Sequence, residues 1–362
     1  MKKKYVDILL IAVAVLLNAC SSDDSGAQPD PTDNKPVKKE IQVMTYASQF
    51  AETALSRRAA PAPTGFSQYT PDKTTTMGIY MLLQSEQSEQ SDWDFPEEKR
   101  ITYNTGTDKW NASFEVEAGK TYTVYGYMPK TEGMTSSLTK STADAATLTI
   151  TGMKAITTDD ICIITGVKET DEGLKEGQFS WNTPTTGNQT FYINILMDHL
   201  YAAAQFRLKI DADYASLRTI KLKTMTLSTD KGSVNAVISL THNTTGVSPV
   251  SSVAYTALGS SSTSDIYKND EGTALPTTTA IPLSVNAYFA PELSSNLTLV
   301  STYDVYDRKG NLIRQNCTAT NQLPDLGAVR GQRVQVNMTV SPTYLYVLSD
   351  PDLDNPTIKI EN

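Results

Sequence analysis

Hydrophobic and polar positions alternate with a period of two along most of this 362-residue chain. The alternation starts at Ile41, Val43 and Thr45, with Gln42 and Met44 between them. Because side chains two residues apart share one face of a strand, this pattern predicts strands with one buried face. Ser, Thr, Gly, Asn and Pro interrupt nearly every run, which is typical of an all-β protein with many short strands. We therefore expect an all-β fold.

Two stretches in the first half of the chain predict particular strands. Gly78–Leu83 is a short apolar run that suits a buried strand. Phe114 and Val116 alternate with glutamates, Ala118-Gly119 can form a turn, and β-branched and aromatic residues follow it. This second pattern predicts a hairpin.

The positions that carry apolar residues change parity in the middle of the chain. Before Asp198 the apolar positions are odd-numbered, at Ile193, Ile195 and Met197. After it, one face of the predicted strand carries the even-numbered Leu200, Ala202, Ala204, Phe206, Leu208 and Ile210. A slip of one residue reverses which side chains face inward. The strand therefore bends or bulges near Asp198-His199, or one sheet ends there and another begins.

We place a domain boundary close to this change of parity, after the loop Asn182–Asn188. The expected domains cover 40–190 and 191–341, and a tail follows at 342–362. His199 stands at the start of an apolar strand, where we expect a core or boundary histidine that is held by hydrogen bonds.

The first twenty residues combine three lysines, an unbroken apolar run at Ile8–Leu17 and small residues before Cys20. This pattern predicts a lipoprotein signal peptide at 1–19, with a lipid attached to Cys20. The apolar run is shorter than the roughly 20 residues that span a bilayer, so we expect an anchor rather than a crossing. An ordinary cleaved signal, in which Cys20 plays no part, is the alternative. Residues 20–39 have no apolar pattern and predict a flexible linker.

Charge and residue types exclude several classes of function. The net charge of −9 argues against a nucleic-acid partner. With only His199 and His242, few arrangements could make a histidine-based metal site or a Ser/His/Asp triad. Sequence motifs of hydrolases, zinc proteases, phosphate loops and dinucleotide sites are missing. We expect no enzyme, no cofactor and no metal, and we interpret Cys162 and Cys317 as small buried residues rather than a disulfide pair.

Paired arginines, Arg57 and Arg58, follow the first strand in a setting rich in small residues and proline. Such a segment suits a trypsin-like or Arg-specific protease, although a solvated turn with two surface arginines explains it as well. Just before it, the spacing of Phe50, Ala51 and Ala54 also allows a turn or two of helix.

The C-terminal tail carries further strand candidates. Ser341-Pro342 is expected to end the preceding strand, and new strands are predicted at Tyr344–Leu348 and Thr357–Glu361. These strands either pair within their own sheet or add to the sheet of a neighbour.

Acidic residues in this tail match four positions of a calcium-binding loop: Asp350, Asp352, Asp354 and Glu361. Pro351 and Pro356 lie within the same stretch, and its flanks are predicted strands rather than helices. An acidic, proline-rich hairpin explains these residues without a metal.

Several segments together resemble the fimbrillins, the lipoprotein pilins of type V pili from gut and oral Gram-negative anaerobes. They are the signal ending at Cys20 and the segments Gly78–Met81, Gly119–Pro129, Asp198–Ala202 and Gly331–Val336. The resemblance implies two tandem transthyretin-like β-sandwich domains. The acidic run Ser21–Asp24 also resembles a signal that directs some lipoproteins to the outer surface of the outer membrane.

The resemblance further implies an assembly mechanism. An Arg-specific protease would cut after Arg57 or Arg58 and release the first strand, 40–47, with Ile41, Val43 and Thr45. A C-terminal strand of another pilin subunit would then fill the groove and extend a head-to-tail polymer. The donor residues implied are Tyr344, Leu345, Tyr346, Val347, Leu348, Ile358 and Ile360.

The sequence is also compatible with other functions. A pilus anchor would keep its lipid. A surface glycan-binding lipoprotein would need an exposed aromatic platform, which the 18 tyrosines or Trp93, Trp110 and Trp181 could supply. A hydrolase with paired carboxylates is a third possibility, but nothing in the sequence marks such a pair.

Overall fold

A computed structural model describes residues 38–54, 65–84, 97–142, 144–186, 188–242, 248–278, 281–282, 286–344 and 351–361. Nearly all the regular structure in these ranges is strand, so the all-β prediction is confirmed. The helical elements are short: α1 (Ala212–Ala215) and the 3₁₀ turn η3 (Pro291–Leu293). No helix in the described ranges is long and apolar enough to cross a membrane.

The largest sheet contains the first strand of the alternating pattern. Its order is β4 (Phe66–Tyr69), β2 (Ile41–Ser48), β15 (Phe191–His199), β13 (Cys162–Lys168), β9 (Thr121–Met128), β5 (Thr75–Leu83), β6 (Lys99–Asn104) and β7 (Lys109–Ala112). β14 (Ser180–Asn182) also pairs with β9. A small separate sheet joins β1 (Lys38–Lys39) to β8 (Val116–Glu117).

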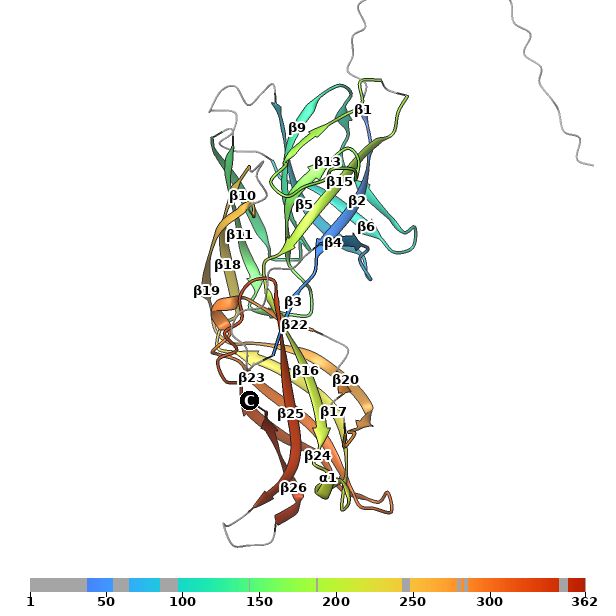
Figure 1. The fold of residues 1–362 in the computed structure, drawn as a ribbon, viewed down its shortest axis with the longest axis vertical. Helices are drawn as coiled ribbons and strands as arrows, with labels where there is room; N and C mark the ends of the chain where they lie inside the picture. The colour runs from blue at the N-terminus through green and yellow to red at the C-terminus, as the bar shows by residue number, and fades with distance from the viewer. Residues whose placement is uncertain are drawn as a thin grey trace, which may run out of the picture. The chain divides into compact units, whose positions relative to one another are not determined.

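A second large sheet is built mainly from the second half of the chain (Figure 1). Its order is β12 (Ile156–Thr157), β22 (Ala287–Phe289), β16 (Ala202–Ile210), β25 (Gln332–Tyr344) and β26 (Pro351–Ile360). β21 (Ile281–Pro282) pairs with β16, and β3 (Ala51–Ala54) pairs with β25. This sheet therefore receives one strand from each end of the folded chain.

Two four-stranded sheets complete the described fold. One has the order β10 (Thr135–Thr142), β11 (Ala145–Lys154), β18 (Ser233–Thr241) and β19 (Val250–Leu258). The other has the order β20 (Ser262–Ala274), β17 (Thr219–Thr229), β23 (Thr298–Tyr306) and β24 (Leu312–Gln322).

Residues of β5 enter two different hydrophobic clusters, which explains why 78–83 reads as an unbroken apolar run. Met77 and Ile79 belong to a cluster shared with β2 and β15. Tyr80 and Leu82 belong to a second cluster, which extends through β10, β11 and β18 into β16 and β25. Because successive side chains of a strand point to opposite faces, β5 is covered on both sides. The buried strand predicted there is confirmed.

The change of parity marks the transition from one sheet to another. β15 ends at His199 in the first large sheet, and β16 begins at Ala202 in the second. The alternative in which one sheet ends near 198–199 is therefore the correct one. The division into domains at 40–190 and 191–341 stays a prediction.

Two local predictions are wrong. Val116–Glu117 pairs with β1 instead of forming a hairpin with β9, because β14 occupies the edge of β9 at Thr121–Thr123. Pro342 does not end its strand, since β25 continues to Tyr344. The ladder tolerates this proline where it stands opposite Pro356, next to a register shift, and beyond the last residue paired with β16.

Candidate functional site

The first strand forms part of the hydrophobic core. β2 pairs in parallel with β15 from Ile41 to Ala47, and β4 pairs with it on the other side from Thr45 onward. The side chains of Ile41, Val43 and Thr45 are 3%, 8% and 2% exposed. They point inward, as their alternation predicts, and the Thr45 hydroxyl donates a hydrogen bond of 2.7 Å to the backbone oxygen of Tyr69.

The same segment continues into the second large sheet. Beyond β2, the chain forms β3, which pairs in parallel with residues 332–335 of β25. The backbone nitrogen of Ala51 donates to the oxygen of Gly331 at 2.9 Å, which fixes the start of this pairing. The turn or two of helix predicted near Phe50 is therefore wrong, because Ala51–Ala54 is a strand. One segment, 41–54, thus supplies a strand to each of two sheets.

His199 bonds to the backbone at Ser48, where the chain leaves β2 and continues toward β3 in the other sheet. Its Nε2 donates to the backbone oxygen of Ser48 at 2.8 Å, and the Ser48 hydroxyl donates to Asp198 Oδ1 at 2.7 Å. Arg330 donates to the other oxygen of Asp198 and to the backbone oxygen of His199. His199 is 3% exposed, so the prediction of a core histidine held by hydrogen bonds is confirmed.

Aromatic and charged contacts extend this attachment to β3. The ring of Phe50 stacks on the imidazole of His199, with 3.6 Å between the centroids. The guanidinium of Arg333, on β25, lies 5.1 Å from the Phe50 ring and 2.8 Å from a carboxylate oxygen of Glu52. These contacts tie the strand to β25 through side chains as well as through the backbone.

Burial shapes the protonation of the groups around this point. It raises the pKa of Tyr288 to about 12, and the nearby charge of Asp160 adds to the effect. Burial also raises the pKa of Glu176, and the negative charge of Asp198 contributes. The tyrosine hydroxyl therefore stays neutral near neutral pH.

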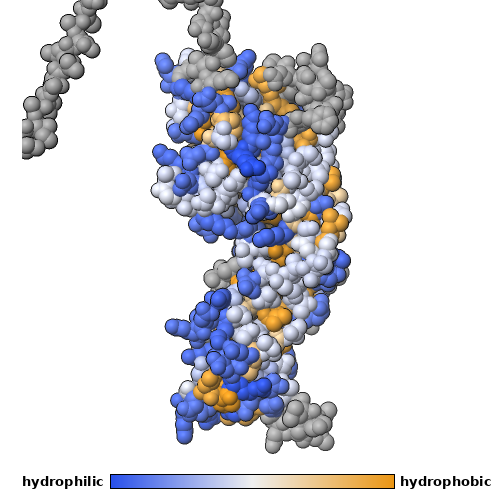
Figure 2. Space-filling model, turned by 180° about the vertical axis from the view of Figure 1, so that it is seen from behind, coloured by the Kyte–Doolittle hydropathy of each residue, from blue (hydrophilic) through white to orange (hydrophobic). Residues whose placement is uncertain are grey.

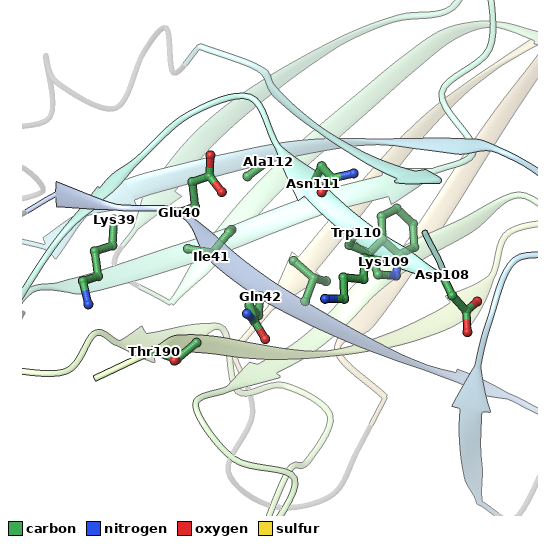
Figure 3. A pocket seen from close by; sticks show the side chains of 11 residues that line it. Lys39, Glu40, Ile41, Gln42, Asp108, Lys109, Trp110, Asn111, Ala112 and Thr190 are labelled. Carbon is green, nitrogen blue, oxygen red and sulfur yellow. The ribbon is translucent and has the colours of Figure 1, made fainter. Parts of the chain in front are cut away.

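A cavity of about 490 Å³ lies beside the N-terminal half of β2 (Figure 3). Ile41 and Gln42 of β2 and Trp110 and Asn111 of β7 are among the residues that line it. β4 pairs with β2 only from Thr45 onward, so this half of the first strand has its described ladder partner on the β15 side alone. The cavity runs along the strand that the resemblance predicts to be removable.

The C-terminal strand lies on the same edge of β25 as β3. β16 occupies one edge of β25 over 333–340, so β3 and β26 must share the other edge. β3 borders 332–335 and β26 borders 338–344 on that edge. β3, which follows the predicted removable strand in the chain, and β26, which contains Ile358 and Ile360 of the predicted donor, are therefore arranged end to end.

The tail pairs within its own sheet in this structure, which is the first of the two alternatives derived from the sequence. Ile358 is 3% exposed and belongs to the main hydrophobic cluster, and Ile360 packs against that cluster. Tyr344 ends β25, and Leu345, Tyr346, Val347 and Leu348 lie outside the described residues.

Cys20 and the paired arginines also lie outside the described residues. Arg57 and Arg58 belong to the connection between β3 and β4. Lipid attachment and cleavage therefore stay predictions.

The acidic residues of the tail are not brought together. Asp352 and Asp354 lie in β26, and the Arg218 guanidinium pairs with Asp354 at 2.8 Å. Glu361 follows the strand and pairs with Lys209 at 3.0 Å. Asp352 lies opposite residue 343, whereas Glu361 bonds to residue 337, a separation of about 20 Å along a strand. Asp350 lies outside the described residues.

The described aromatic residues mostly pack inside the protein. Trp181 is fully buried and Trp110 is 9% exposed, whereas Trp93 lies outside the described residues. Tyr192 on β15 is 46% exposed. On the face drawn in Figure 2, apolar side chains lie in small groups separated by hydrophilic ones. The described surface therefore offers little support for an aromatic glycan platform.

Both described cysteines are free and buried, as predicted. Cys162 has a polar environment, however, because His199 Nδ1 lies 3.6 Å from its sulfur. Sequence reasoning found His199 but missed Ser48, Phe50, Arg330 and Arg333. These partners are distant in sequence, and no local pattern marks them.

No protein family model matches the sequence, and no curated protein is significantly similar to it. Several solved structures have distant likeness to this chain. A candidate cell adhesion protein from Bacteroides uniformis is 11% identical, with 92% of this chain and 99% of that chain covered and a TM-score of 0.40. A fimbrial protein from Bacteroides vulgatus is 13% identical, with 89% and 98% covered and a TM-score of 0.37. The fimbrial anchor protein Mfa2 from Porphyromonas gingivalis is 11% identical, with 88% and 97% covered and a TM-score of 0.26.

Proposed function

We propose that this protein is a pilin of the fimbrillin kind, a surface lipoprotein that is cut after its first strand and then polymerises by strand exchange. The observation that carries the proposal is that segment 41–54 contributes a strand to each of two sheets. This segment continues into the rest of the fold only through 55–64, which contains Arg57 and Arg58. One cut in that connection would disconnect both strands at once.

Loss of segment 41–54, which contains β2 and β3, would leave two sheets incomplete. Each fully buried aliphatic side chain contributes about 1.5–3 kcal/mol, and Ile41 and Val43 would be withdrawn from the cluster beneath β15. β15, and β25 at 332–335, would also lose the ladder partners on one edge, which would then be exposed. An open sheet edge beside an apolar trough binds an extended segment with alternating apolar residues.

The replacement strand, in this proposal, is the C-terminal tail of another subunit. Ile358 and Ile360 alternate with polar residues, as a strand with one buried face requires. Because β26 pairs with its own β25 before assembly, donation requires it to leave that edge. Exchange then replaces bonds within one chain by equivalent bonds between chains and generates a head-to-tail polymer.

The lipid on Cys20 would hold the precursor at the outer membrane surface. Cleavage would remove Cys20 together with the first strand, so the polymerised subunit would no longer carry its anchor. The proposed partners are an Arg-specific protease before assembly and related pilin subunits afterwards. The cleavable arginines favour a polymerising subunit over a permanent anchor, which would keep both its lipid and its first strand.

A charge-preserving substitution tests this function. The double variant Arg57→Lys/Arg58→Lys keeps the positive charge but removes the Arg-specific cut. When wild-type protein and this variant are treated with an Arg-specific protease, only the wild type is expected to form SDS-resistant ladders. Ladders of equal length from the uncut variant would contradict the proposal.

A further inference from the structure

Three side chains of types that bind metal ions lie close together next to Ser48, where the chain leaves β2. Cys162 begins β13 and stands directly opposite His199 of β15, and Asp160 precedes it in the chain. His199 Nδ1 lies 3.6 Å from Cys162 Sγ and 2.7 Å from Asp160 Oδ2. One donor atom from each residue lies within 4.8 Å of the other two.

The hydrogen bond to Ser48 determines what His199 presents to this group. Nε2 donates to a backbone oxygen, so Nε2 carries a proton. In neutral imidazole, Nδ1 is then a lone-pair acceptor, and it faces a carboxylate oxygen of Asp160 that is also an acceptor. Two acceptors at 2.7 Å require a proton or a cation that both can bind.

The charges around the group also favour a cation. Asp198 is paired with Arg330, and Asp159 is paired with Lys73. In the described part of the chain, Asp160 has His199 as its ion-pair partner, and its Oδ1 is buried with no hydrogen-bond partner. A divalent cation bound here would offset the charge of the Asp160 carboxylate.

We propose that Asp160, Cys162 and His199 bind a zinc ion. Zinc takes nitrogen, sulfur and oxygen ligands in tetrahedral geometry, with bonds of about 2.0–2.3 Å that set neighbouring ligand atoms about 3.3–3.6 Å apart. The 3.6 Å between Cys162 Sγ and His199 Nδ1 already fits this range. A carboxylate rotation that moves Asp160 Oδ2 about half an ångström away from His199 Nδ1 brings that pair close to it as well. The bond from His199 Nε2 to Ser48 orients the imidazole, as outer contacts of zinc-bound histidines do.

An access route reaches the site from solvent. Asp160 lines a cavity of about 340 Å³ together with Tyr69, Asp72 and Tyr288. Cys162 and His199 do not line this cavity and are 2% and 3% exposed. The carboxylate can therefore capture the ion first, and a water molecule from the cavity can fill the fourth position.

Zinc binding by the full chain tests this inference without any assembly assay. Protein stripped with a chelator and reloaded with Zn²⁺ is expected to retain one ion per chain after desalting, measured by elemental analysis. The Cys162→Ser variant is expected to lose this ion. Cys317→Ser is the matched control, because Cys317 is also a buried free cysteine but lies away from the site. Equal zinc retention by the Cys162→Ser variant, or none by the wild type, would overturn the proposal.

Cobalt substitution in the wild type gives a readout that does not depend on a folded variant. Co²⁺ bound through Cys162 is expected to produce a thiolate charge-transfer band and the visible bands of tetrahedral coordination. If stripped wild-type protein titrated with Co²⁺ shows neither feature, Cys162 is not a ligand and the assignment fails. Because the chain is tested before cleavage, this result is independent of whether the protein polymerises.

Discussion

The ring of Phe50 stacks on the imidazole of His199 at the point where the chain passes from β2 to β3. We expect Phe50→Ala to lower the free energy of unfolding of the uncut chain by about 2 kcal/mol, because the contact and part of the buried area are lost. Denaturant titration measures this change. A change of less than about 0.5 kcal/mol would show that this stacking does not stabilise the uncut chain.

Because buried and exposed side chains alternate along β2, substitutions at two neighbouring positions are expected to change the free energy of unfolding by very different amounts. Ile41 is 3% exposed, whereas Gln42 is exposed on the opposite face. Ile41→Asp introduces an unpaired charge into the core and is expected to destabilise the uncut chain by about 3 kcal/mol or more. Gln42→Asp should change the free energy of unfolding by less than about 0.5 kcal/mol. Thermal unfolding of the two variants checks the assigned face, and similar losses in both would refute it.

The tail is expected to be needed for donating a strand but not for accepting one. A subunit that lacks residues 345–362 should still be cleaved and should add to one end of a growing polymer, where it stops further extension. Mixing it with excess wild-type subunit should therefore shorten the SDS-resistant ladder in proportion to its fraction. Lys359→Asp is the control, because Lys359 is exposed on β26. Ladders of unchanged length with the shortened subunit would rule out the tail as donor.

Acid is expected to weaken the fold through His242. Burial, and then the charge of Lys140, lower the pKa of His242 to about 4, although Asp144 opposes this shift. The unfolded chain, with a histidine pKa of about 6.5, binds a proton between those values that the folded chain does not. The free energy of unfolding should therefore fall as the pH drops from about 6.5 to about 4. His242→Gln should reduce that decrease in denaturant titrations at pH 7 and pH 5, and an unchanged decrease would contradict the assignment.

Lipid attachment is predicted to depend on one residue. Cys20→Ala should abolish fatty acylation and release the precursor from the membrane fraction, because the acylated cysteine is the proposed anchor. Metabolic labelling with a fatty acid, followed by membrane fractionation, measures both effects. Persistent labelling of the variant would refute lipidation at Cys20.

Alternation was sufficient to predict the all-β fold and the inward face of the first strand. Ile41, Val43 and Thr45 share one face of β2 because the period of a strand is two, and this property is local. The change of parity likewise located the end of β15, since a one-residue slip exchanges the faces of a strand.

Pairing between distant segments could not be predicted in the same way. β3 pairs with β25 from the other end of the fold, and alternation states which face is buried but not which strand lies alongside. The hairpin expected at 114–127 is wrong for the same reason, because β14 occupies the edge that its first arm would need. The partners of His199 at Ser48 and Phe50 meet it only because β2 lies beside β15.

N-terminal sequencing and intact mass of the surface protein, with and without an Arg-specific protease, test the proposed mechanism most directly. Before treatment, we expect an acylated Cys20 at the N-terminus. After treatment, we expect a new N-terminus at Arg58 or Ala59 that appears together with SDS-resistant ladders. A protein that keeps its acylated Cys20 after treatment and stays monomeric would contradict removal of the first strand, and with it the strand-exchange mechanism.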